Sequence, residues 1–297
     1  MQYNKPALTY EQQADQLLAR GLIANRVTLI ERLQSVNYYR LSGYWYPFRN
    51  SDSTFKPGTT FETIWRRYTF DRRLRLIVLD AIERTEIAIR TEVTYRMAHA
   101  HAHGQFGYLN TANMPNLEGA DHLRLISQLR DMYARSRESF AKHFHDKYGD
   151  EHDLLPVWMV TELMALGELL TFFRGIPTSM KQAIGAKFGV SDRVFESWLR
   201  ALLAVRNVCA HHSRLWNREL GYKPTIPRKD RQWHQPVEIR DNRVFAILTI
   251  LKYFMNSIAP QSNWPGRLME LLEEYPDVPR APMGFTDDWR ECPIWKV

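Results

Sequence analysis

The chain has 297 residues, of which 44% are hydrophobic and 25% charged, and its formal net charge at pH 7 is +7. This composition excludes a wholly disordered or fibrous chain. The chain is also long enough to bury a hydrophobic core without stabilisation by a metal or by disulfides. With only Cys209 and Cys292, no disulfide framework is expected, and no apolar run approaches the ~20 residues that span a bilayer. Residues 1–10 lack an apolar signal core, so we predict a soluble, cytoplasmic protein that does not contact membranes.

Helical patterns follow one another along the chain, and strand patterns are nearly absent. Amphipathic helices are predicted over 10–20 and 25–38, and an aromatic connector over 38–48 follows them. The stretch 60–101 has no glycine or proline, which predicts one long helix that Asp71 can interrupt. Further helices are predicted over 120–147, 156–174, 178–188, 192–212, 241–258 and 265–274, with a basic loop over 219–240 and an irregular tail.

These patterns predict an all-α fold, a helical bundle around a long central helix with an N-terminal helical extension. We expect residues 1–58 to form a helical and aromatic region that packs on a helical domain over 59–260. Residues 261–297 would add a C-terminal helix and the tail. Because no linker divides these regions, one compact unit is expected.

The basic excess points toward RNA as a partner. Thirty of the 40 basic residues are Arg, whose planar guanidinium grips phosphate and stacks on bases. Residues 200–243 hold ten basic side chains against four acidic ones. Such basic clusters are more often solvated helix faces, and that interpretation stays open for residues 200–243. It also stays open for a second basic cluster, which comprises Arg66, Arg67, Arg72, Arg73 and Arg75. The candidate RNA-binding residues are Arg40, Arg218, Lys223, Arg228 and Lys229.

The sharpest motif is the sequence from Arg206 to His212, Arg-Asn-Val-Cys-Ala-His-His, at the end of the predicted 192–212 helix. On a helix, residues four apart lie ~40° apart around the axis and residues five apart lie ~140° apart. Asn207 and His211 therefore share a face, and Arg206 flanks them. The motif brings a cation, an amide and an imidazole to one helix end.

This set suits RNA cleavage without a metal or another cofactor. A histidine can take the proton of a ribose 2′-OH or give one to the leaving 5′-oxygen, and an arginine can stabilise the charge on phosphate. Two copies facing each other in a homodimer would divide the acid and base roles. The spacing alone is weak evidence, because Arg96 and His101 match it too. The alternative is a helix-end histidine that caps carbonyls and an arginine paired with a carboxylate.

A resemblance to a known family adds to this interpretation. It is carried by segments spread over residues 5–218, namely 5–6, 8–10, 17–22, the tyrosine-rich block 37–44, 61–62, 70–75, 81–91 and the block 206–218. The chain resembles the Abi-like family, the AbiD/AbiF type of bacterial abortive-infection protein within the HEPN superfamily.

The resemblance implies a HEPN-like helical fold and a metal-independent ribonuclease site that dimerisation completes. Arg206 and His211 would be catalytic, Asn207 the polar residue after the arginine, and His212 and Arg214 auxiliary. It also implies a defence toxin that cleaves RNA during phage infection, and restraint by a small inhibitory RNA, as in a toxin–antitoxin system.

Other candidates keep two interpretations each. His99, His101 and His103 alternate at a helix end, but without further ligands we predict no metal site. Glu83, Glu86 and Arg90 on the long helix form either a structural ion pair or a network that orients Arg206 and His211. The aromatic side chains of 38–46 either pack the N-terminal helices or stack on bases, and Cys209 is expected to be a packing residue.

Three functions are therefore open. The first is an endoribonuclease that leaves a 2′,3′-cyclic phosphate and acts as an anti-phage toxin. The second is a non-catalytic RNA-binding module of a defence or toxin–antitoxin system. The third is a structural scaffold with little affinity for RNA.

Overall fold

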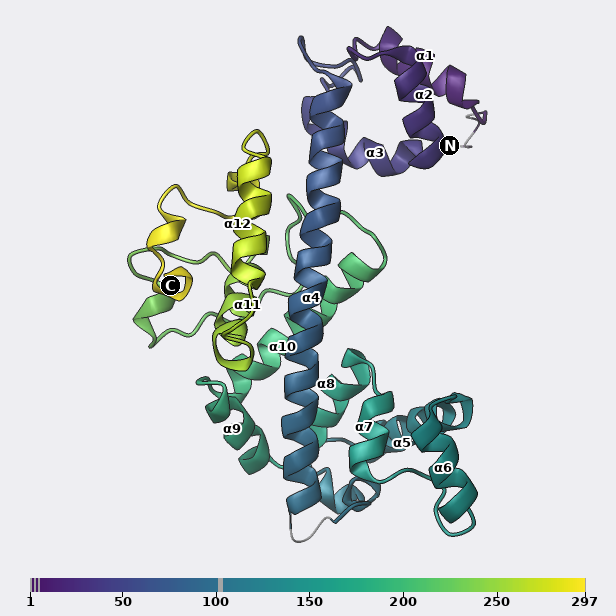
Figure 1. Ribbon diagram of the computed structural model, residues 1–297, viewed down its shortest axis with the longest axis vertical. Coiled ribbons are helices and arrows are strands. Elements are labelled where there is room, and N and C mark those ends of the chain that lie inside the picture. Colours follow the sequence, from purple (N-terminus) through teal and green to yellow (C-terminus); the bar gives the residue numbers. More distant parts are fainter. Residues whose placement is uncertain (1, 3, 5, 101–103, 297) are drawn as a thin grey trace. The chain divides into compact units, whose positions relative to one another are not determined.

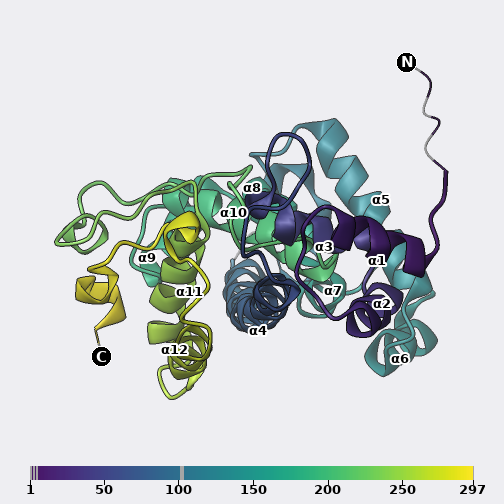
Figure 2. The ribbon, with the colours of Figure 1, turned by 90° about the horizontal axis from the view of Figure 1, so that it is seen from above.

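The computed structural model describes residues 2, 4, 6–100 and 104–296. The all-α prediction is confirmed: these residues form twelve α-helices and seven short 3-10 turns (Figures 1 and 2). No sheet occurs in this part of the chain, where pairing is limited to the isolated bridges Ile23–Thr60 and Arg49–Phe55. None of its helices has the length and apolar character needed to cross a membrane.

The chain divides into two compact units. The first comprises residues 1–76 and 266–279, and the second comprises residues 77–265 and 280–297. The long helix α4 (Phe61–His99) and the helix α12 (Trp264–Glu274) each contribute to both units.

The first unit begins with α1 (Tyr10–Ala19) and α2 (Arg26–Ser35), close to the predicted bounds. The Thr9 and Asn25 side chains accept hydrogen bonds from backbone N–H groups of the first turns, which otherwise lack partners. The apolar faces of both helices pack into a core shared with the start of α4. Figure 1 shows α1, α2 and α3 beside that end of α4.

The predicted aromatic connector over 38–48 is instead mostly helical. It forms α3 (Tyr38–Trp45) and a 3-10 turn over Tyr46–Phe48. The Asn37 side-chain oxygen starts α3 by accepting a hydrogen bond from the Tyr39 N–H at 2.8 Å. Tyr44 and Trp45 are each 1% exposed, whereas Tyr39 and Tyr46 are more than 70% exposed. Burial of two large rings on one side stabilises this short helix.

Helix α4 runs without interruption, so the predicted break at Asp71 is wrong. The Asp71 side chain is fully buried and accepts a hydrogen bond from the Tyr44 hydroxyl at 2.5 Å. It also forms an ion pair with Arg75 one turn later. Because both charges are satisfied inside the first unit, the acidic residue is accommodated in the helix interior.

The basic cluster at the start of α4 is largely committed to contacts within the first unit. Arg66 and Arg73 form ion pairs with Asp277 and Glu274. Arg67 lies over the Phe48 ring at 4.0 Å, and burial lowers the pKa of its guanidinium. These contacts favour a structural role for the cluster over an RNA-binding one.

Two predicted helices of the second unit are each divided in two. Residues 120–147 form α5 (Gly119–Arg135) and α6 (Ser139–Tyr148). Residues 156–174 form α7 (Val157–Leu163) and α8 (Leu166–Gly175), with extended backbone at Met164 and Ala165. The Thr161 and Thr94 hydroxyls lie 2.8 Å apart, which joins α7 to α4.

The remaining helices follow the prediction closely. They are α9 (Thr178–Lys187), α10 (Asp192–Ala210), α11 (Val244–Ile258) and α12. Helix α11 is buried along most of its length. The tail is irregular but anchored, because the buried Trp295 indole donates a hydrogen bond to the Thr249 hydroxyl at 3.0 Å.

Candidate functional site

Helix α10 carries the Arg206–His211 motif, and one of its sides forms part of the core. The Ser191 side chain accepts a hydrogen bond from the Val194 N–H and starts the helix. Phe195, Trp198, Leu202, Val205 and Cys209 recur at helical spacing and are all buried. The opposite side therefore faces outward at the positions of the motif.

The helix ends in the middle of the motif. The Ser213 N–H donates to the Val208 carbonyl at 2.8 Å and the His212 N–H to the Cys209 carbonyl at 3.0 Å. This is the Schellman pattern, whose left-handed position is usually glycine. Here His212 occupies it with φ of 56°. The stop makes His211 the C-cap residue and fixes where its ring leaves the helix.

Arg206 and Asn207 lie in the last turns of α10, and His211 is the C-cap residue that follows them. The Arg206 guanidinium donates a hydrogen bond to the Asn207 side-chain oxygen at 3.2 Å, and both side chains are half-buried. His211 is exposed, and its ring forms no hydrogen bond with the described part of the chain. Arg206 likewise forms no ion pair with a described carboxylate.

Helix α4 brings a carboxylate toward the motif. Burial raises the pKa of Glu86, while the positive charges of Arg90 and Arg206 oppose that rise. Arg90 donates hydrogen bonds at 2.8 Å to both the Glu86 carboxylate and the Met164 carbonyl. The extended backbone between α7 and α8 frees that carbonyl for the contact. Glu86, Arg90 and Arg206 thus form one half-buried charged group.

Glu83 stands apart from this group, because its side chain is exposed and acts on Glu86 only through its charge. Two further acidic residues near this group were not among the predicted site residues. Glu162 on α7 lies 3.6 Å from Arg90, and Glu168 on α8 also raises the pKa of Glu86. Only the tertiary fold brings these residues to α4, and no sequence spacing indicates it.

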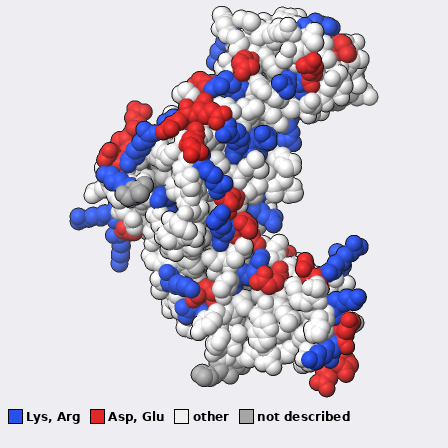
Figure 3. All heavy atoms as spheres, viewed as in Figure 1, with Lys and Arg blue, Asp and Glu red and all other residues white. Residues whose placement is uncertain are grey.

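The candidate RNA-binding residues do not form one cluster. Arg40 lies on α3 in the first unit. Arg218 is held near the motif by donating a hydrogen bond to the Arg214 carbonyl at 2.8 Å. Lys223, Arg228 and Lys229 are exposed on the loop after it. On the face shown in Figure 3, basic and acidic side chains are interspersed. An RNA-binding site there would therefore depend on a few neighbouring side chains and not on one continuous basic surface.

The described residues contain no group of three or more His, Cys, Asp or Glu side chains that could hold a metal. His99 is described and its ring lies 2.8 Å from the Tyr95 carbonyl, whereas His101 and His103 lie outside the described residues. Cys209 is 1% exposed, which fits a packing role.

Comparison with known proteins gives one match. The family model described as Abi-like protein matches residues 31–217, more than half of the chain. The matched region includes α3, the whole of α4 and the motif on α10. No curated protein and no solved structure matches.

Proposed function

The chain belongs to the Abi-like protein family, and from this premise we propose that it is an endoribonuclease acting in abortive infection. Family membership itself suggests the abortive-infection role. The finer proposal is a metal-independent enzyme of the HEPN superfamily, of the AbiD/AbiF type, with Arg206, Asn207 and His211 as its centre. Its toxin role and its restraint by a small inhibitory RNA are part of the same proposal.

The chemistry follows from the three side chains. The neutral His211 ring accepts the proton of a ribose 2′-OH, and the 2′-oxygen then attacks the adjacent phosphorus. The bond to the 5′-oxygen breaks, and that oxygen takes a proton from an imidazolium. The products are a 2′,3′-cyclic phosphate and a free 5′-OH. Arg206 stabilises the charge on the phosphoryl oxygens, and Asn207 fixes the guanidinium through their hydrogen bond.

Two copies of the motif complete this cycle. One histidine cannot accept and donate a proton in the same step, so a second His211 from another copy would be the acid. The exposed position of His211 at the end of α10 supports this, because the ring is accessible to a second chain. His212 and Arg214 flank the centre as auxiliary groups. A homodimer is therefore part of the proposal.

One observation carries the proposal: Arg206 donates a hydrogen bond to Asn207 and acts through its charge on the Glu86 carboxyl, and the exposed His211 follows on the same helix end. Because its guanidinium is already positioned, Arg206 needs little reorientation when phosphate binds, so the free-energy cost of that step is small. Glu86 and Arg90 would position Arg206 without touching the substrate.

The test compares wild type, His211→Ala and the control His143→Ala on total RNA in excess EDTA. His143 is an exposed histidine on α6, so its variant matches the change without touching the motif. We expect cleavage by wild type and His143→Ala only. Equal cleavage by all three would mean a contaminating nuclease. Binding without cleavage would instead favour the non-catalytic RNA-binding module.

A further inference from the structure

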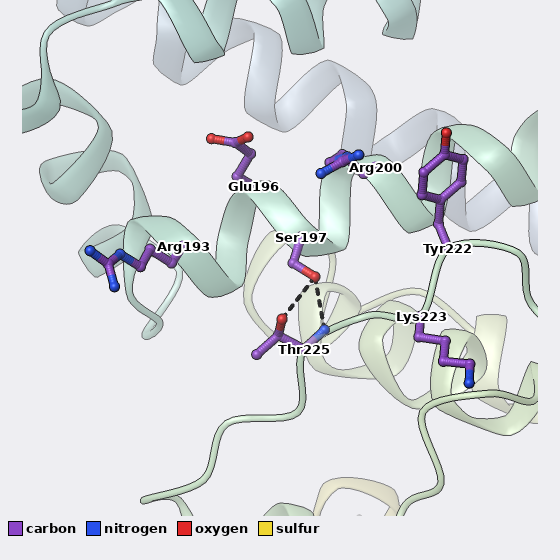
Figure 4. Close-up of a pocket in the computed structure, with 7 residues that line it drawn as sticks. All are labelled: Arg193, Glu196, Ser197, Arg200, Tyr222, Lys223 and Thr225. Atoms are coloured by element: carbon purple, nitrogen blue, oxygen red, sulfur yellow. Dashed lines mark hydrogen bonds between the residues drawn. The ribbon is translucent and has the colours of Figure 1, made fainter. Parts of the chain in front are cut away.

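We propose that a pocket of about 350 Å³ on α10 binds the phosphates and one base of the RNA strand that reaches the Arg206–His211 centre. This inference rests on the proposed function for its RNA substrate. Figure 4 shows side chains from α10 and from the following loop around the pocket. They are Arg193, Glu196, Ser197, Arg200, Tyr222, Lys223 and Thr225.

The pocket carries a net positive charge. Arg193, Arg200 and Lys223 are exposed, and none forms an ion pair with a described carboxylate. Glu196 contributes the pocket's acidic side chain, and Arg174 pairs with it at 3.1 Å. Three cations therefore remain for an anionic ligand, and the arginine guanidinium matches the geometry of phosphate, which it can bind through two parallel hydrogen bonds.

The loop wall is fixed to the helix. The Thr225 N–H donates a hydrogen bond to the Ser197 hydroxyl at 2.8 Å, and the Trp198 indole donates one to the Thr225 carbonyl at 2.9 Å (Figure 4 draws the former). Trp198 is fully buried, so this anchor belongs to the core. Tyr222 and Lys223 are thus held close to α10 before any ligand binds, which lowers the entropy cost of binding.

An aromatic platform lies beside the cations. The Arg200 guanidinium lies 5.2 Å from the centre of the Tyr222 ring, and Figure 4 shows the two side chains next to each other. Tyr222 is 54% exposed, so the ring retains surface on which a base can stack. Cations together with a stacking ring are the usual elements of sites for single-stranded nucleic acid. A site for a small free anion would need only the cations, without a ring on which a base can stack.

The register of α10 connects the pocket with the motif. At 100° per residue, Arg193, Arg200, Asn207 and His211 all fall within ~40° of one another around the axis. Arg200 and Asn207 are separated by two turns, or about 10 Å, which is roughly three stacked nucleotides at ~3.4 Å each. One strand along this side of α10 can therefore contact both the pocket and His211.

The test measures RNA binding separately from cleavage. In a His211→Ala background with EDTA, the affinity for a labelled single strand of about twelve nucleotides is followed against salt concentration. Arg200→Ala and Lys223→Ala should each weaken binding roughly threefold to tenfold and reduce the salt slope by ~0.7. Tyr222→Ala should weaken binding about as much, and Tyr222→Phe should not.

The control is Arg124→Ala, which removes the same charge from an exposed site on α5. Equal loss in this control, or no loss in the pocket variants, would overturn the proposal, as would absence of RNA binding. A mononucleotide that binds as tightly as the strand would make the pocket a free-nucleotide site and also overturn it.

The cleavage-competent protein separates this inference from the proposed function. Arg200→Ala there should raise KM for a long RNA and leave kcat unchanged. If wild type binds RNA through the pocket but does not cleave it, the proposed function fails and the binding site stands. If wild type cleaves RNA and the pocket variants bind RNA as tightly as wild type, the proposed function stands and the proposed binding site fails.

Discussion

The positive charge of Arg206 on α10 favours the ionised form of the Glu86 carboxyl on α4, although 120 positions separate the two residues in the chain. Burial acts in the opposite direction and dominates, so the pKa of Glu86 stays above its ordinary value of 4.5. Burial thus disfavours the ionised form of the Glu86 carboxyl, and the charges of Arg90 and Arg206 favour it.

The first prediction is a pH dependence of stability. A carboxyl whose pKa is raised in the folded state binds protons more tightly there, so its contribution to stability is lost as pH rises above 4.5. Glu86→Gln does not titrate. The free energy of unfolding of this variant, relative to wild type, should therefore increase from pH 4.5 upward and then level off. Urea unfolding of both proteins across this range measures the difference, and a decrease with pH would contradict the assignment.

The second prediction concerns the buried Asp71–Arg75 pair, whose side chains are 0% and 5% exposed. Asp71→Ala removes the carboxylate that pairs with the buried Arg75 guanidinium in the first unit and should lower the free energy of unfolding by about 3–5 kcal/mol. Asp15→Ala breaks the exposed, solvent-screened pair with Arg26 in the same unit and should lower the free energy of unfolding far less. Similar losses in denaturant unfolding would show that Asp71 is not structurally special.

Structural features that local interactions determine can be predicted from the sequence, whereas features that depend on tertiary contacts cannot. The start of α10 and the shared face of Asn207 and His211 follow from local rules, because Ser191 caps and the helix repeat sets the face. Helix α3 was missed because dense aromatic residues obscure the helical period. The breaks inside α5–α6 and α7–α8 carry no glycine or proline between the helices.

Longer-range relationships lie beyond sequence reasoning. The arginines at the start of α4 find partners such as Asp277, which lies 211 residues from Arg66. The pocket on α10 combines Arg193 with a tyrosine from a loop that Ser197 anchors. Each of these depends on where the chain returns in space, which no spacing along the sequence encodes.

The third prediction uses the left-handed backbone at His212, where φ is 56°. His212→Gly and His212→Ala both remove the ring, so their difference reports the backbone alone. Glycine adopts this conformation without strain, and alanine does not. The glycine variant should be more stable than the alanine variant by about 1 kcal/mol, measured by thermal unfolding. Equal stability would show that the backbone at this position is not left-handed.

The fourth prediction tests whether the centre needs two copies. Wild type and His211→Ala chains, each tagged, are coexpressed in equal amounts so that they pair at random. If each centre uses the histidines of two chains, total activity should be about one quarter of the wild-type value at equal protein. If each chain acts alone, about one half remains. Tag pull-down confirms that mixed pairs form.

In the proposed reaction, Arg206 and His211 cleave RNA by attack of the 2′-oxygen without a metal. The most direct measurement follows a labelled single strand in excess EDTA with wild type, Arg206→Ala and His211→Ala, and identifies the fragment ends. Wild type alone should produce 2′,3′-cyclic phosphate and 5′-OH ends, and no cut should occur where the 2′-OH is replaced by hydrogen. Cleavage of that 2′-deoxy position, or 5′-phosphate ends, would contradict the proposed reaction.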